Sequence, residues 1–152
     1  MVARKYGVDA AAMTARLQQT ADRFNLPMGN FERIYNSRKA QELGLWAQSK
    51  GRGPQFHRAA FQAYFADDRN IARVPVLLDV AACAGLSRRE AKSVIETGAF
   101  AAAVDADWAL SRERGIRVVP TFVMGDARLV GAKPYAVMQQ FVENSGTGSK
   151  EP

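Results

Sequence analysis

Apolar residues recur at intervals of three and four along most of this chain, which is the spacing of one face of an α-helix. In the first such stretch Asp9 stands where a helix N-cap is expected, and the pattern ends before Pro27. The residues on the apolar face of this stretch are Met13, Leu17, Ala21 and Phe24. The pattern therefore predicts an amphipathic first helix.

The same periodicity predicts further helices, whose ends carry recognisable capping residues. Proline suits the first helical position, glycine suits the left-handed residue after the last turn, and Ser or Asn side chains accept from free N–H groups. The strongest of these signals is a capping box in Ser87-Arg88-Arg89-Glu90. The predicted helices begin near Ser37, Pro54, Pro75, Ser87, Ala99 and Pro134.

The period changes from helical to extended at residues 118–124, where the sequence reads VVPTFVM. β-Branched and aromatic residues favour a strand, Gly125-Asp126 is typical of a tight turn, and residues 128–131 form a second short strand. The sequence thus predicts a hairpin near the C-terminal end. The predicted organisation is a mainly helical region at 1–117, a ββα part at 118–143 and a disordered tail at 144–152.

An isolated hairpin is marginal in water, because its edges and one of its faces lack partners. Pro120 adds to this imbalance, since a proline in a strand has no N–H and belongs at an edge, a bulge or a turn. We therefore expect the sheet to be incomplete in this chain. We also expect a symmetric homodimer that pairs exposed hairpin edges or exchanges helices.

Composition narrows the functional classes. The 152 residues suit one domain, and 47% hydrophobic and 24% charged residues are ordinary for a globular protein. The net charge of +6 arises in residues 1–76. The basic residues of this half are scattered singly or in pairs, which favours a solvated surface over a nucleic-acid partner. The chain shows no secretory signal and no membrane-spanning stretch, so the expected location is the cytoplasm, without a membrane partner.

The chain has one cysteine and one histidine, which excludes a disulfide scaffold and gives no His/Cys cluster for a metal. Cys83 lies among small residues in VAACAGL and is interpreted as an inert core thiol near a helix C-terminus, where the dipole opposes a thiolate. His57 is interpreted as a partly buried surface or interface residue. Trp46 and Trp108 are predicted to be core residues, and Asn70 a turn or cap residue.

The segment VVPTFVM, followed by a hairpin, LVGAKP and a short helix, resembles the C-terminal half of a thioredoxin-fold protein. Earlier stretches, among them RKYGVD, YNSRKAQELGLWAQSKGRGPQF and VLLDVAACAGLSRREAKSVIETGAF, are similar to DsbA-like oxidoreductases of the FrnE type. Related families are 2-hydroxychromene-2-carboxylate isomerase and the kappa-class glutathione transferases. The resemblance covers nearly all of residues 3–143. It implies an α/β, thioredoxin-like fold with an inserted helical domain. Within that fold, this chain is expected to be mostly α with a C-terminal β-hairpin.

The resemblance also implies three substrate-binding residues. The Val119–Pro120 bond is expected to be cis, so that the main chain of Val119 is exposed to an extended thiol or peptide substrate. Asn36 corresponds to an Asn beside the substrate groove of the isomerase and transferase relatives. For Asn36 the alternative is a helix N-cap, and the two roles are compatible.

One departure from the family pattern bears on activity. These oxidoreductases carry a Cys-x-x-Cys pair after their first strand, and this sequence holds no such pair. A fragment of a longer protein, a misplaced gene start and a natural truncation would each explain this. We therefore expect a truncated family member without redox activity, with no catalytic residue and no cofactor, whose partners are a thiol or disulfide peptide or a small-molecule substrate.

Two alternatives remain open. The chain could be a relative of the glutathione-dependent isomerases and transferases, in which case glutathione would be its cofactor. It could also be a non-catalytic protein that binds a peptide, a small acid or a second copy of itself.

Overall fold

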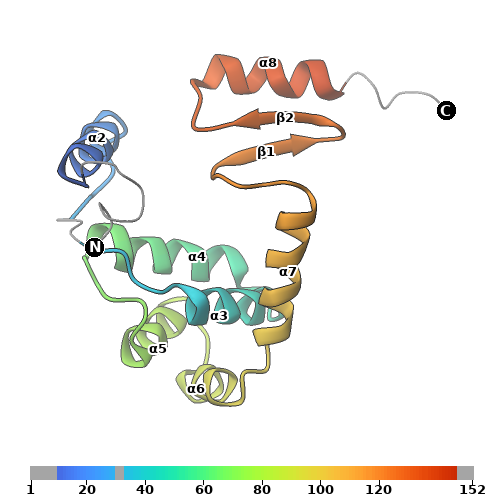
Figure 1. Cartoon of the computed structure of the whole chain (residues 1–152). Coiled ribbons are helices and arrows are strands. Elements are labelled where there is room, and N and C mark those ends of the chain that lie inside the picture. The colour runs from blue at the N-terminus through green and yellow to red at the C-terminus, as the bar shows by residue number, and fades with distance from the viewer. Residues whose placement is uncertain (1–9, 30–32, 147–152) are drawn as a thin grey trace. The chain divides into compact units, whose positions relative to one another are not determined.

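The computed structural model of the chain describes residues 10–29 and 33–146. Most of this part is helical, and the only sheet in it has two strands (Figure 1). The prediction of a mostly helical chain with a C-terminal hairpin is thereby confirmed. The elements, in chain order, are α2 (Ala10–Arg23), α3 (Arg38–Ser49), α4 (Gly53–Phe61), the π-helical η1 (Gln62–Ala66), α5 (Val74–Cys83), α6 (Arg88–Thr97), α7 (Ala101–Glu113), β1 (Thr121–Met124), β2 (Ala127–Val130) and α8 (Tyr135–Gly146).

The contacts divide the chain into two units, Met1–Asp105 and Ala106–Pro152. The division falls within α7, whereas the sequence pattern places the change from helical to extended structure at residue 117. None of the helices in the described residues is long and apolar enough to span a membrane.

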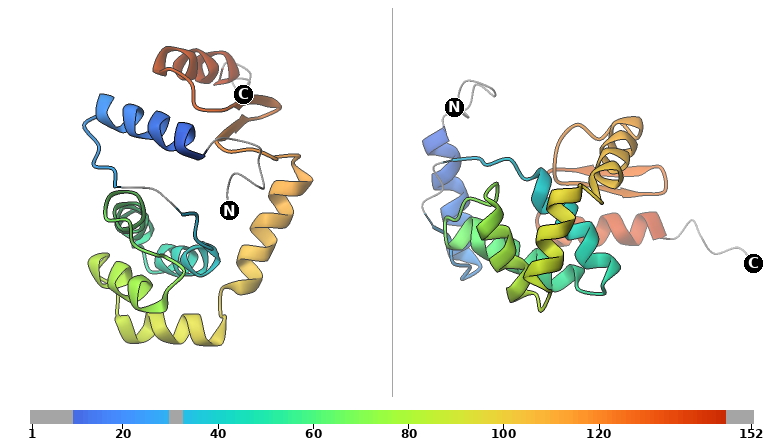
Figure 2. Two further views of the ribbon diagram at one scale, coloured as in Figure 1. Left: turned by 60° about the vertical axis from the view of Figure 1, so that its left-hand side comes forward. Right: turned by 90° about the horizontal axis from the view of Figure 1, so that it is seen from below.

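The core of the first unit is made by the facing sides of α3, α4, α5 and α6, which contact one another in pairs (Figure 2). Leu43 and Leu77 have no exposed surface, and the ring of Phe56 is only 1% exposed. Burying each such side chain stabilises the fold by about 1.5–3 kcal/mol relative to leaving it in water. Other members of the core are Ala40, Trp46, Ala47, Ala63, Ile71, Val80, Ala81, Ala84 and Ala91.

The second unit contains the hairpin and α8. β1 and β2 pair antiparallel with Phe122 opposite Leu129 and Met124 opposite Ala127. Gly125 begins the turn with a φ of +58°, a conformation that residues with a Cβ rarely adopt. The helix α8 contacts both strands. None of its described residues, 106–146, is buried, so this unit has no fully covered core within the described chain.

Several details differ from the sequence prediction. Trp108 is 39% exposed rather than part of a core. The helix that begins at Gly53 changes to π-helical geometry at Gln62, and α8 continues to Gly146, into the segment predicted to be a tail. Asp9 and the remainder of that tail, 147–152, lie outside the described residues.

Candidate functional site

The predicted substrate-binding segment lies immediately before β1. The peptide bond between Val119 and Pro120 is cis, which is the isomer predicted from the sequence. The carbonyl oxygen of Pro120 accepts a hydrogen bond from the N–H of Gly131 at 2.8 Å, which extends the hairpin ladder by one residue. The Thr121 hydroxyl donates to the carbonyl of Val118 at 2.7 Å. Both ends of the segment are therefore fixed to the hairpin.

Val119 is the most exposed large apolar residue of the described chain, at 88%. Within the described residues, no hydrogen bond involves its main-chain N–H or C=O. A polar main-chain group without a protein partner is free to bond to water or to a ligand. Val119 thus presents both an unpaired peptide group and an apolar side chain.

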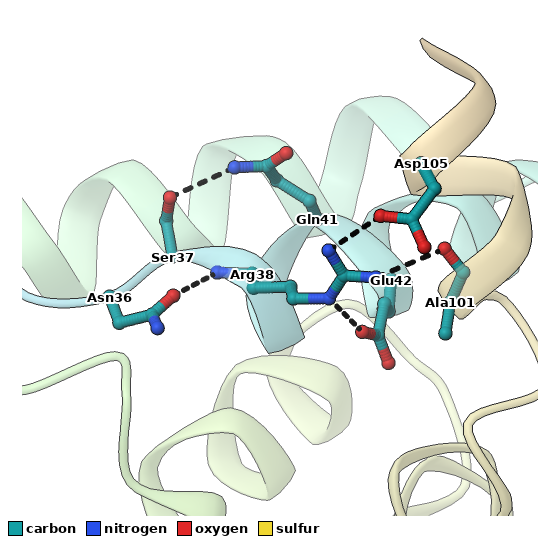
Figure 3. Close-up of polar contacts among 7 residues, drawn as sticks. All are labelled: Asn36, Ser37, Arg38, Gln41, Glu42, Ala101 and Asp105. Atoms are coloured by element: carbon teal, nitrogen blue, oxygen red, sulfur yellow. Dashed lines mark hydrogen bonds and ion pairs between the residues drawn. The ribbon is translucent and has the colours of Figure 1, made fainter. Parts of the chain in front are cut away.

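Asn36, the third predicted residue, lies in the first unit at the start of α3. Its Oδ1 accepts from the backbone N–H of Arg38, the first residue of α3, at 2.9 Å, so its side chain caps this N–H although the N-cap position itself is Ser37 (Figure 3). Ser37 makes no side-chain cap and instead accepts from Gln41 Nε2 at 2.9 Å. Asn36 and Val119 belong to different units and are treated as separate features.

Arg38, next to Asn36, is the centre of a polar cluster that the sequence analysis missed (Figure 3). Its guanidinium lies 3.2 Å from Glu42 and 2.7 Å from Asp105, and it donates to the carbonyl of Ala101 at 3.3 Å. The hydrogen bond to Asp105 raises the pKa of Arg38 above its ordinary value. Through these bonds Arg38 joins the start of α3 to the first turn of α7.

Glu42 is the one buried charged residue of the described chain, at 5% exposure. A buried carboxylate is costly unless a cation is paired with it, and Arg38 supplies that cation. The i,i+4 spacing of Arg38 and Glu42 was visible in the sequence. Nothing local pointed to Asp105, which is 67 residues away. The cluster borders a cavity of about 400 Å³, and because the Arg38 guanidinium is engaged by both carboxylates we interpret it as structural.

Cys83 is exposed, which corrects the interpretation of it as a core thiol. Leu77, Val80 and Ala81 form the buried face of α5. At 3.6 residues per turn, position 83 lies to the side of that face, although its neighbours in the sequence are small and apolar. His57 is also exposed, with its ring against Gly44. Asn70 forms the predicted turn, since its Oδ1 accepts from the N–H of Ala72 at 2.9 Å.

An apolar hollow of the first unit lies between α2 and the α4–η1 segment. Its volume is about 550 Å³. It is closed on one side by the chain near Gly29, whose N–H donates to the carbonyl of Phe65 at 2.7 Å. Its lining residues include Leu17, Ala21, Leu26, Met28, Phe61 and Phe65.

The comparisons with known proteins agree with this arrangement of helices followed by a hairpin and a helix. A family model described as a DSBA-like thioredoxin domain matches residues 3–143. The chain belongs to this family. The crystal structure of the probable DsbA oxidoreductase SCO1869 from Streptomyces coelicolor is similar to this DsbA-like chain, with a TM-score of 0.88 and 27% sequence identity. The match covers 100% of this chain and 68% of that chain.

A curated relative is the uncharacterized protein YwbO of Bacillus subtilis (strain 168). It is 29% identical to this DsbA-like chain over 100 residues, which is 65% of this chain and 50% of that protein. The chain thus spans half the length of this relative. The comparisons show the DsbA-like, thioredoxin-related fold that the sequence predicted, with two strands of sheet in the described residues.

Proposed function

We propose that this DsbA-like chain binds an extended thiol or disulfide peptide, or a small molecule of that chemistry, at Val119–Pro120, and that it does not cycle between a dithiol and a disulfide. The observation that carries the proposal is the exposure of Val119 together with its unpaired main chain, at the family's predicted substrate-binding position. Membership of the FrnE type and a cytoplasmic location are part of the same proposal.

The redox half of the proposal follows from electron counting. Reducing a substrate disulfide takes two electrons, and a dithiol enzyme supplies them by closing its own disulfide. The 152 residues contain one thiol, that of Cys83, which can form a mixed disulfide with the substrate but has no second cysteine in the chain to release it. Catalytic turnover by this route is therefore not expected.

An insulin-reduction assay with dithiothreitol as the electron donor tests this half. The wild-type chain and Cys83→Ala should both show the rate of the buffer control. Because Cys83 is exposed, substitution there leaves the core intact. A wild-type rate several-fold above that of Cys83→Ala would show that a single thiol suffices and would overturn this half of the proposal.

The binding half is tested with a short peptide that contains one S-methylcysteine, which has the chemistry of the ligand but cannot react. Backbone recognition predicts that Val119→Ala binds this peptide within about twofold of wild type. Val119→Pro should bind about tenfold more weakly, because the hydrogen bond of the lost N–H corresponds to roughly 1.4 kcal/mol. The shift of the Thr121 amide in NMR spectra reports binding, and the spectra also show whether each variant is folded.

Asn36 is proposed as a separate ligand contact on the first unit. Its Oδ1 is used by the cap, whereas its amide nitrogen has no acceptor among the described residues. Asn36→Asp keeps the oxygen that accepts from Arg38 and replaces the amide nitrogen with a second oxygen. This variant should therefore weaken binding while leaving the helix intact. Reduced glutathione in place of the peptide tests the alternative of a glutathione-dependent relative. Saturable binding of glutathione, with none of the peptide, would favour that alternative.

A further inference from the structure

We draw no further inference here: the strongest candidate, the apolar hollow between α2 and the α4–η1 segment, carries none because nothing in the structure shows what covers it.

Discussion

Leucine residues occupy two very different environments in this chain. Leu77 has no exposed surface and lies in the core of the first unit, whereas Leu110 in α7 is 43% exposed. Truncating a buried leucine removes its apolar contacts and leaves a cavity that neighbours fill only in part. The cost of a leucine-to-alanine change should therefore differ sharply between the two positions.

We predict that Leu77→Ala lowers the free energy of unfolding by about 2–5 kcal/mol. Leu110→Ala is the matched control and should change it by about 0.5 kcal/mol or less. Urea unfolding followed by circular dichroism measures both. Equal losses at the two positions would show that α7 is covered in solution or that the core is arranged differently.

At the scale of secondary-structure elements, ion pairs connect helices whose apolar faces already meet. Asp79 of α5 accepts from Arg88, at the first position of α6, and from Arg69, in the turn that precedes α5. These two hydrogen bonds hold the pKa of the Asp79 carboxyl below its ordinary value, and the bond from Arg88 has the larger effect on that pKa. The ion pair between Asp79 and Arg88 thus couples the orientation of α6 to that of α5.

A lowered pKa in the folded state has a defined consequence for stability. The contribution of Asp79 is complete above the pKa of an unfolded aspartate, about 4, and is lost as the pH falls through the lower pKa of the folded state. We predict that Asp79→Asn loses less stability than wild type between pH 6 and pH 2. The thermal midpoint as a function of pH measures this.

Asp107→Asn serves as the control for this prediction. Asp107 is exposed on α7 and makes no ion pair within the described residues. Its variant should therefore follow the wild-type curve. If Asp79→Asn also follows that curve, the contacts of Asp79 with the two arginines do not persist in solution.

At the scale of the whole molecule, burial is distributed unevenly. Every residue that the structure describes as buried lies between Ala21 and Val104, in the first unit. Stability varies across a protein with the density of buried apolar contacts. The two units should therefore differ in how readily they open.

We predict that amide hydrogens of α3 and α5 exchange most slowly with solvent, with those near Leu43 and Leu77 approaching the rate set by global unfolding. Amides of β1 and β2 should exchange at least tenfold faster, because no residue of the hairpin unit is buried among the described residues. Native-state hydrogen exchange followed by NMR measures both sets. Uniform protection across the chain would mean that the hairpin unit has a core that the described residues do not account for.

Local patterns in the sequence determined the helices and the hairpin, because short-range rules govern where such elements begin and end. The Ser87 hydroxyl accepts from the N–H of Glu90 at 3.3 Å, as its capping box predicts, and Gly85 adopts a left-handed φ of +76° after α5. The resemblance to DsbA-like proteins came from motifs of the same kind. The family and the arrangement of the elements were accordingly available before any coordinates.

Which side of each helix became buried was decided only by the tertiary structure. Cys83 and Trp108 lie in apolar stretches, yet both are exposed, because burial depends on where a neighbouring helix contacts the surface and not on local composition. The Arg38 cluster has the same origin. Arg38 and Glu42 are one helical turn apart, but Asp105 reaches them only because α7 returns to the start of α3. Contacts between residues distant in sequence leave no periodic trace in a single chain, so only the folded arrangement shows them.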